Sequence, residues 1–395
     1  MAPSDPDFDE ILNRRDSESY KWSEYPADVL PLFVADMDFR SPEPVARALR
    51  EYIDRGVFGY PRGLHTHDIR EMPDLPPVVV ERMERRYRWK IGLEDVVFVP
   101  GVNPGVNLAC HTVAAPGGAA LVQPPVYPPI LACAKNAHLQ RLEAPLLYEN
   151  DGSYSVDWDA FSSAITPETR IFVLCNPHNP VGRVFRRDEL TRMAEICLSR
   201  NVIICADEIH SDLVYSSHEH IPIASLDPEI AQHTITLIAP SKTFNLAGLQ
   251  CAFAVIPNAD LRRRFHSTRE GLVPWVNAMG LIGAAAAYRH GQPWLERLLP
   301  YLEANRDFLW EFRQRELPGI KMRKPEATYL GWLDCRDLAL DDPYEFFLKE
   351  ARVALNSGPS FGMGGAGFVR LNFGCPRAIL QEALERMKQA IQKKS

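Results

Sequence analysis

The stretch "IAPSKTFNLAGLQ", residues 238–250, decides the fold because it places a lysine just where a buried strand is expected to end. The run "TITLIA" at 234–239 is typical of a buried strand, and Asn245 and Gly248 predict a turn after it. Lysine is rarely left at the inner end of such a strand unless its amine is paired or does chemistry. The sequence therefore predicts that Lys242 belongs to a functional site.

The chain around this stretch alternates strand-like and helix-like segments. Apolar runs predict strands at 94–100, 119–123, 170–175 and 201–206, and residues 188–200 have the spacing of a helix. This alternation predicts an α/β fold, in which a mostly parallel sheet is covered by helices on both faces. Ligands of such sheets bind at the carboxyl ends of the strands, so the loops that follow the strands are the expected place for a site.

The C-terminal third has a different pattern. A long helical pattern at 294–316 is followed by isolated strands at 329–333 and 368–373, which predicts a smaller α+β domain. We expect three parts, namely an N-terminal segment 1–50 that joins the small domain, a large cofactor-binding domain 51–288 and a small C-terminal domain 289–395.

Composition narrows the class of protein. The chain has 395 residues and a net charge of −7, which does not favour binding to nucleic acid. Residues 1–19 are acidic and polar, unlike a signal peptide, and no apolar stretch reaches the roughly 18 residues of a membrane helix. The eight cysteines form no CxxC pair and mostly lie in apolar runs, so we expect reduced core thiols in a cytoplasmic protein that does not bind membranes.

Polar side chains follow two further strands. "CNPHNPVG" at 175–182 predicts a rigid turn, in which Asn179 is either an ordinary turn residue or a donor to a ligand oxygen. "ADEIH" at 206–210 places Asp207 directly after an apolar run, where an unpaired charge is costly. Asp207 could pair with an arginine, bind a metal or hold a protonated ring nitrogen, and organic-cofactor chemistry fits the lysine two strand ends away best.

A single cofactor would use all of these groups. Lys242 would bond to its aldehyde, Asp207 would keep a pyridine nitrogen protonated, and Asn179 would hold a phenolic oxygen. The cofactor phosphate would be bound by Ser241 and by the loop at 101–103, which includes Val102 and Asn103, and Tyr127 in "PPVYPP" would stack on the ring. The sequence therefore predicts pyridoxal 5'-phosphate on Lys242.

Other motifs are expected to play no part in cofactor or metal binding. The "GMGGAG" of 362–367 matches GxGxxG, but it precedes a strand instead of opening a helix, so it predicts a loop and not a dinucleotide site. No metal site is predicted, because His65 and His67 have no further ligands nearby. They lie in the polar, proline-rich segment 63–77, which we expect to be an ordered loop or a lid; it is either a solvated insertion or the edge of a partner subunit's site.

Taken together, the motifs resemble the class I/II aminotransferase fold, and within it the cystathionine β-lyase-like C–S lyases. His210 replaces the tyrosine of aspartate aminotransferase-like enzymes, as is typical of the lyase-like branch. Ala239 and Gln250 stand where many relatives have phosphate ligands, so the phosphate must depend on Ser241, backbone amides and Tyr60. The motifs that carry the resemblance, over about 34–387, are "VADMDF" (34–39), "GYP" (59–61), "PPVYPP" (124–129), "CNPHNPVGRV" (175–184), "ADEIH" (206–210), "SKTFNLAGL" (241–249), "TYLGWLD" (328–334) and "GFVRLNFGCPR" (367–377).

The resemblance implies further roles. It implies a homodimer with active sites shared at the subunit interface, in which Tyr60 reaches the phosphate of the partner's cofactor and Arg370 binds the substrate carboxylate. The residues alone allow other interpretations equally well. Arg370 could form a structural ion pair, and Tyr60 could be a core tyrosine. The implied activity is C–S β-elimination from an amino-acid substrate. Transamination and a β/γ-elimination or replacement reaction of specialised metabolism are the alternatives.

Overall fold

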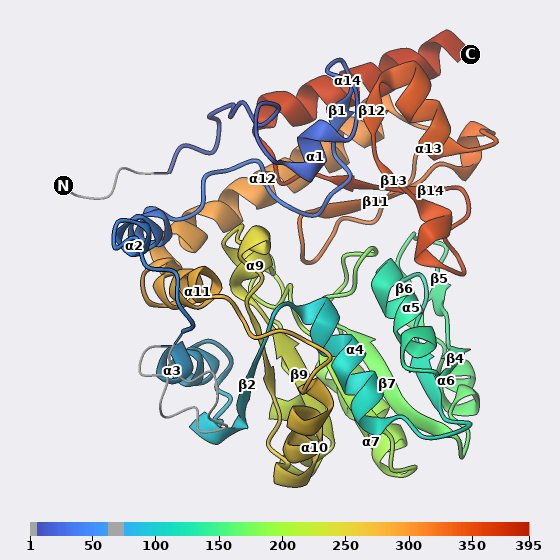
Figure 1. Cartoon of the computed structure of the whole chain (residues 1–395). Helices are drawn as coiled ribbons and strands as arrows, with labels where there is room; N and C mark the ends of the chain where they lie inside the picture. The colour runs from blue at the N-terminus through green and yellow to red at the C-terminus, as the bar shows by residue number, and fades with distance from the viewer. Residues whose placement is uncertain (1–5, 62–74, 395) are drawn as a thin grey trace.

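The computed structural model describes residues 6–61 and 75–394 and confirms the expected α/β architecture (Figure 1). Its central seven-stranded sheet has the order β2-β10-β9-β8-β7-β3-β4. Neighbouring strands from β9 to β4 are parallel, and β10 is antiparallel to both β2 and β9. The strands are β2 (Val96–Val99), β3 (Ala119–Val122), β4 (Gln140–Glu143), β7 (Thr169–Cys175), β8 (Ile203–Asp207), β9 (Thr234–Ile238) and β10 (Ala252–Val255).

Helices cover both faces of this sheet because most of its strands are apolar on both sides. Along β2, Val97 and Val99 pack with α4, α5 and α10, whereas Val96 and Phe98 face α3 and α11. On the second face, α6 and α7 cover the other half of the sheet. The helices are α3 (Leu75–Tyr87), α4 (Val102–Val113), α5 (Pro128–Asn136), α6 (Trp158–Ala164), α7 (Arg187–Leu198), α8 (Pro228–Gln232), α9 (Pro240–Thr243), α10 (Ala259–Arg269) and α11 (Ala278–His290).

The C-terminal part contains a separate three-stranded antiparallel sheet, β11-β14-β13, in which the strands expected at 329–333 and 368–373 are β11 and β14. The long helix α12 runs from α11 into this part, and α14 packs against it (Figure 1). The N-terminal segment joins this part through β1, which pairs in parallel with β12. The domain boundaries at 50 and 288 stay a prediction. The remaining elements are α1 (Tyr20–Ser23), α2 (Glu43–Ile53), α12 (Gln292–Glu316), α13 (Pro343–Phe346), α14 (Arg377–Lys394), β1 (Leu30–Pro31), β5 (Leu146–Tyr148), β6 (Tyr154–Val156), β11 (Leu330–Asp334), β12 (Val353–Ala354), β13 (Asn356–Ser357) and β14 (Phe368–Asn372).

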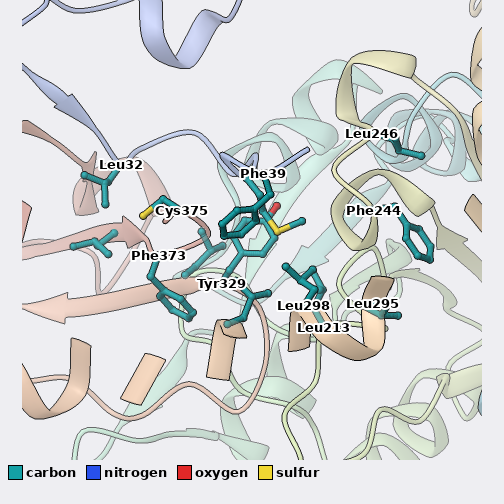
Figure 2. Close-up of a cluster of buried hydrophobic side chains, with 14 of the residues drawn as sticks. Leu32, Phe39, Leu213, Phe244, Leu246, Leu295, Leu298, Tyr329, Phe373 and Cys375 are labelled. Carbon is teal, nitrogen blue, oxygen red and sulfur yellow. The ribbon is translucent and has the colours of Figure 1, made fainter. Parts of the chain in front are cut away.

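A continuous apolar cluster joins the N-terminal segment, the large sheet's loops and the small sheet. Figure 2 labels members of this cluster from all three parts: Phe39 from the N-terminal segment, Tyr329 and Phe373 from the C-terminal part, and Phe244, at the right, from the large domain. Phe244 and Tyr329 are both fully buried. The core therefore extends to the turn that carries Lys242, which fixes this turn between the two sheets.

One expectation about the loops changes. Residues 75–77, expected to belong to the loop 63–77, form the start of helix α3, because the first turn of a helix tolerates Pro76 and Pro77, whose missing N–H groups would be unpaired there in any case. The rest of the segment 63–77, including His65 and His67, lies outside the described residues. The glycine-rich 362–367 is a turn before β14, as expected, with Gly362, Gly364 and Gly367 at positive φ.

In the described ranges 6–61 and 75–394, no helix combines the length and apolar character needed to cross a membrane. All eight cysteines are buried free thiols.

Candidate active site

Lys242 lies in the short helix α9, four residues after the end of β9. Its Nζ donates a hydrogen bond of 2.6 Å to the carbonyl oxygen of Ala35 in the N-terminal segment. Burial, and then the positive charge of Arg370, lower the pKa of Lys242 to about 8, although Asp36 and Asp207 act in the opposite direction. A substantial fraction of the amine is therefore neutral near physiological pH and available as a nucleophile or base.

Asp207 ends β8, the strand beside β9, and is buried. Its Oδ1 accepts a hydrogen bond of 3.2 Å from the backbone N–H of Ile209, and it forms no ion pair within the described chain. Burial raises the pKa of Asp207 to about 6. No cluster of three or more metal-ligating side chains exists among the described residues either. Among the described residues, Asp207 thus has neither an arginine partner nor a metal-ligand cluster. Of the three roles considered, holding a protonated ring nitrogen is the one that agrees with these surroundings.

Arg370 on β14 contacts oxygen atoms that carry no full charge. Its Nη1 donates to Asn179 Oδ1 at 2.9 Å, and its Nη2 donates to Asn356 Oδ1 at 2.6 Å and to the carbonyl of Phe33 at 3.0 Å. Burial lowers the pKa of Arg370 to about 10, and its Nε is buried without a partner in the described chain. A structural ion pair is therefore not its role here, and a buried guanidinium without a carboxylate is a site for an anion.

Aromatic side chains surround these charges. Tyr127 precedes α5 and is partly exposed, and burial followed by the charge of Asp207 raises its pKa. The buried ring of His210 packs against Tyr329 with ring centroids 6.0 Å apart. Burial lowers the pKa of His210 well below its ordinary value, so the ring is neutral, and its Nδ1 has no partner in the described residues.

The expected phosphate ligands lie at helix starts. Val102 and Asn103 are the first two residues of α4, and the preceding Gly101 has φ +125°. The first backbone N–H groups of a helix have no partner within it and attract anions. Ser241 precedes Lys242 in α9, and its hydroxyl makes no hydrogen bond with the described residues. The 12-residue α4 and Ser241 therefore fit a phosphate group.

Tyr60 is not brought together with these residues in one chain. It is 90% exposed and lines a cavity of about 740 Å³ between α2 and α11. It makes no hydrogen bond or ring contact with residues 6–61 or 75–394. The alternative of a core tyrosine is wrong, since the described residues leave the side chain exposed.

Several groups near Lys242 escaped the sequence analysis. The carbonyl of Ala35 also accepts a hydrogen bond of 2.8 Å from Tyr329 Oη, so one oxygen fixes both side chains. Thr243 and Asp212 form a further contact behind the lysine, described below. Ala35 and Tyr329 lie in the motifs "VADMDF" and "TYLGWLD", which were the only sequence signals for them. A motif does not show that a backbone carbonyl is an acceptor.

The residues fit the expected cofactor. The site has a largely buried amine of lowered pKa, a buried carboxylate without a cation, an orphaned guanidinium nitrogen and a helix start for an anion. These match an aldehyde, a ring nitrogen, a substrate carboxylate and a phosphate in turn.

Fold and site together define an enzyme of the large class built on a lysine at the carboxyl edge of a mostly parallel sheet. Within that class, the chain belongs to the aminotransferase class I and II family, whose model matches residues 27–387. The expected family and fold are thus confirmed.

Three similar proteins refine this placement. The chain is 40% identical to cystathionine beta-lyase PatB of Bacillus subtilis over 97% of this chain and 99% of that protein. It is 43% identical to the solved structure of OvoB, with a TM-score of 0.90 over 98% and 99% of the two chains. The structure of cystalysin from Treponema denticola, which contains a pyridoxal 5'-phosphate cofactor, is 32% identical with a TM-score of 0.92 over 98% and 99%.

Proposed function

We propose that this protein is a pyridoxal-phosphate-dependent lyase that breaks the C–S bond of an amino acid by β-elimination. The observation that carries the proposal is the meeting of Lys242 and Asp207, at the carboxyl ends of neighbouring strands, with Arg370 of the small sheet, whose charge also acts on Lys242. The likeness to a cystathionine beta-lyase over nearly the full length supports the C–S bond as the one that breaks. Transamination is the alternative and is not favoured.

Each residue has a distinct task in this reaction. When bound, the cofactor serves as an electron sink that stabilises negative charge on the substrate α-carbon. Arg370 binds the substrate carboxylate, and Asn179, oriented by Arg370, holds the cofactor's phenolic oxygen. Lys242 would hold the cofactor and, with its amine free, would take the α-proton of the substrate. Asp207 would keep a proton on the ring nitrogen, and His210 and Tyr127 would contact the ring.

The overall reaction conserves its atoms without an oxidant. An S-substituted cysteine and one water give a thiol, pyruvate and ammonia. The bond between the β-carbon and sulfur breaks, and its electron pair leaves with the sulfur. The electron pair left by the α-proton forms the double bond between the α- and β-carbons. Water enters only when the resulting enamine hydrolyses.

We further propose a homodimer with shared sites. Val57, Phe58 and Tyr60 expose 71%, 62% and 90% of their surfaces around the cavity between α2 and α11 or beside it. Such a group of exposed apolar side chains is typical of an interface. Tyr60 would then reach the phosphate in the partner's site. Because none of the eight buried thiols is paired, we also place the protein in the cytoplasm.

The function is tested by product identity. Purified protein loaded with pyridoxal phosphate is incubated with cystathionine, S-methylcysteine and cysteine, and pyruvate, ammonia and free thiol are quantified. We expect the three products in equal amounts without added 2-oxo acid, and none from Lys242→Ala. A 2-oxo acid that retains the sulfur, formed only when a second 2-oxo acid is present, would mean transamination instead.

A further inference from the structure

A buried charge cluster lies behind Lys242 and has no place in the mechanism above. Its centre is Asp212, five residues after Asp207 in the loop that follows β8. Arg82 Nη2 of α3 forms an ion pair of 2.7 Å with Asp212 Oδ2. Tyr87 Oη donates to Oδ1 at 2.8 Å and Thr243 Oγ1 donates to Oδ2 at 3.1 Å. Two separate elements, α3 and α9, therefore converge on one carboxylate.

The cluster excludes solvent. Arg82 and Asp212 are each 1% exposed, and the guanidinium lies 4.7 Å from the ring centroid of Tyr288 and 5.5 Å from that of Phe244. Burial raises the pKa of Asp212, but the charges of Arg82 and Arg86 and the hydrogen bonds from Arg82 and Tyr87 together outweigh this effect and lower it overall, so the carboxylate is ionised. A buried ion pair often contributes no more stability than an apolar pair of the same shape. Stability alone thus gives little reason for these charges.

The cluster contacts the two residues that follow Lys242, Thr243 and Phe244. Thr243 is 1% exposed and donates its hydroxyl to Asp212, and Phe244 lies against the Arg82 guanidinium. On the other side of the lysine, Nζ donates to Ala35. The contact of Thr243 with Asp212 thus holds the backbone of α9, while the side chain of Lys242 extends toward Ala35. Because α9 has only four residues, its own hydrogen bonds give it little rigidity.

We propose that Thr243, Asp212 and Arg82 are positioning residues that set the direction of the Lys242 amine in the site. The proposal rests on the proposed function of Lys242 as the residue that carries the cofactor and moves the α-proton. Proton transfer depends steeply on geometry, so loss of the Thr243 contact should slow catalysis more than it weakens substrate binding.

The test compares Thr243→Val, which keeps the shape and loses the hydroxyl, with Thr243→Ser, which keeps the hydroxyl. For the cofactor-loaded protein we measure kcat, KM, Tm and the pH midpoint of the near-visible absorbance. We expect Thr243→Val to lower kcat about tenfold, with KM within about twofold and a midpoint displaced by about half a pH unit or more. Thr243→Ser should restore all of these values to near those of the wild type.

Thr236→Val is the matched control. Thr236 is fully buried in β9, and its hydroxyl has no hydrogen-bond partner among the described residues. The same change there should leave kcat and the absorbance midpoint unaltered. If Thr243→Val lowers Tm but keeps kcat and the midpoint of the wild type, the cluster is purely structural and the proposal is wrong.

A second variant decides the question if Thr243→Val does not fold. Arg82→Lys keeps the charge beside Asp212 but loses the planar group packed on Phe244 and Tyr288. We expect a lower kcat and a displaced midpoint, and wild-type values for both would overturn the proposal. A failure of the proposed function is distinguishable, because the wild-type protein would then show no absorbance attributable to Lys242.

Discussion

Arg370 and Asn179 are joined by a hydrogen bond of 2.9 Å that crosses from the small sheet to the large one. Because Asn179 accepts with its Oδ1, its Nδ2 is left to donate elsewhere, which is what a ligand oxygen requires. One contact thus orients both the proposed ligand of the substrate carboxylate and the proposed ligand of the cofactor.

The first prediction concerns Arg370. In Arg370→Lys, the paired N–H groups that match a carboxylate are lost, so kcat/KM for amino-acid substrates should fall about 100-fold or more. The near-visible absorbance of the loaded protein should persist, because Lys242 is untouched. Arg336→Lys, at a half-exposed arginine paired with Asp334, is the control and should retain normal kinetics. A substrate KM and kcat unchanged in Arg370→Lys would remove this residue from the site.

The second prediction concerns Asp207. Without a charge to hold the ring proton, Asp207→Asn should bind the cofactor but lose about 10³-fold or more in kcat. Glu208→Gln is the neighbouring control, because the Glu208 carboxylate faces away and contacts His220 and the backbone of Ile223. It should lower Tm with little change in kcat. An Asp207→Asn variant within about tenfold of wild type would mean that the ring is held differently.

The third prediction uses the lowered pKa of Lys242. Because its pKa is about 8, the amine loses its proton as pH rises through 8, and the rate at which the apoprotein attaches pyridoxal phosphate should rise and then level off above that pH. A lysine with the ordinary pKa of about 10.4 would instead keep gaining rate up to pH 10. The rate is followed by near-visible absorbance, with Lys242→Ala as the blank.

The fourth prediction concerns assembly. If Tyr60 serves the partner's site, mixing Tyr60→Phe subunits with Lys242→Ala subunits gives hybrid dimers with one site that lacks both groups and one that has both. Activity should therefore recover on mixing. Hybrid dimers verified by native mass spectrometry that remain inactive would argue against sharing.

The sequence identified the charged residues that directly follow apolar strands. Lys242 and Asp207 were predictable because an unpaired charge at the end of a buried strand is costly unless it has a function. The parallel pairing of β8 and β9 brings the two residues together. Arg370 was assigned to the substrate by resemblance, and its contacts with Asn179 and Asn356 agree with that assignment. Strand β4, Gln140–Glu143, was missed because three of its four residues are polar and none of them is buried at the sheet edge.

The contact of Lys242 with Ala35 and the pairing of Arg82 with Asp212 could not be predicted from one sequence. The Ala35 carbonyl is a backbone group, and any residue would supply it. The pairing of Arg82 with Asp212 joins positions 130 residues apart, and nothing local marks either as buried. Such contacts depend on how separate elements pack and not on local pattern.

The most direct test of the whole account is to find where the cofactor is attached. The loaded protein is reduced with borohydride, which makes the bond to the cofactor permanent, and is then digested and mapped by mass spectrometry. The account predicts one modified residue, Lys242, in the peptide that contains "SKTFNLAGL". A label on any other lysine, or no label at all in protein that had been given the cofactor, would contradict it.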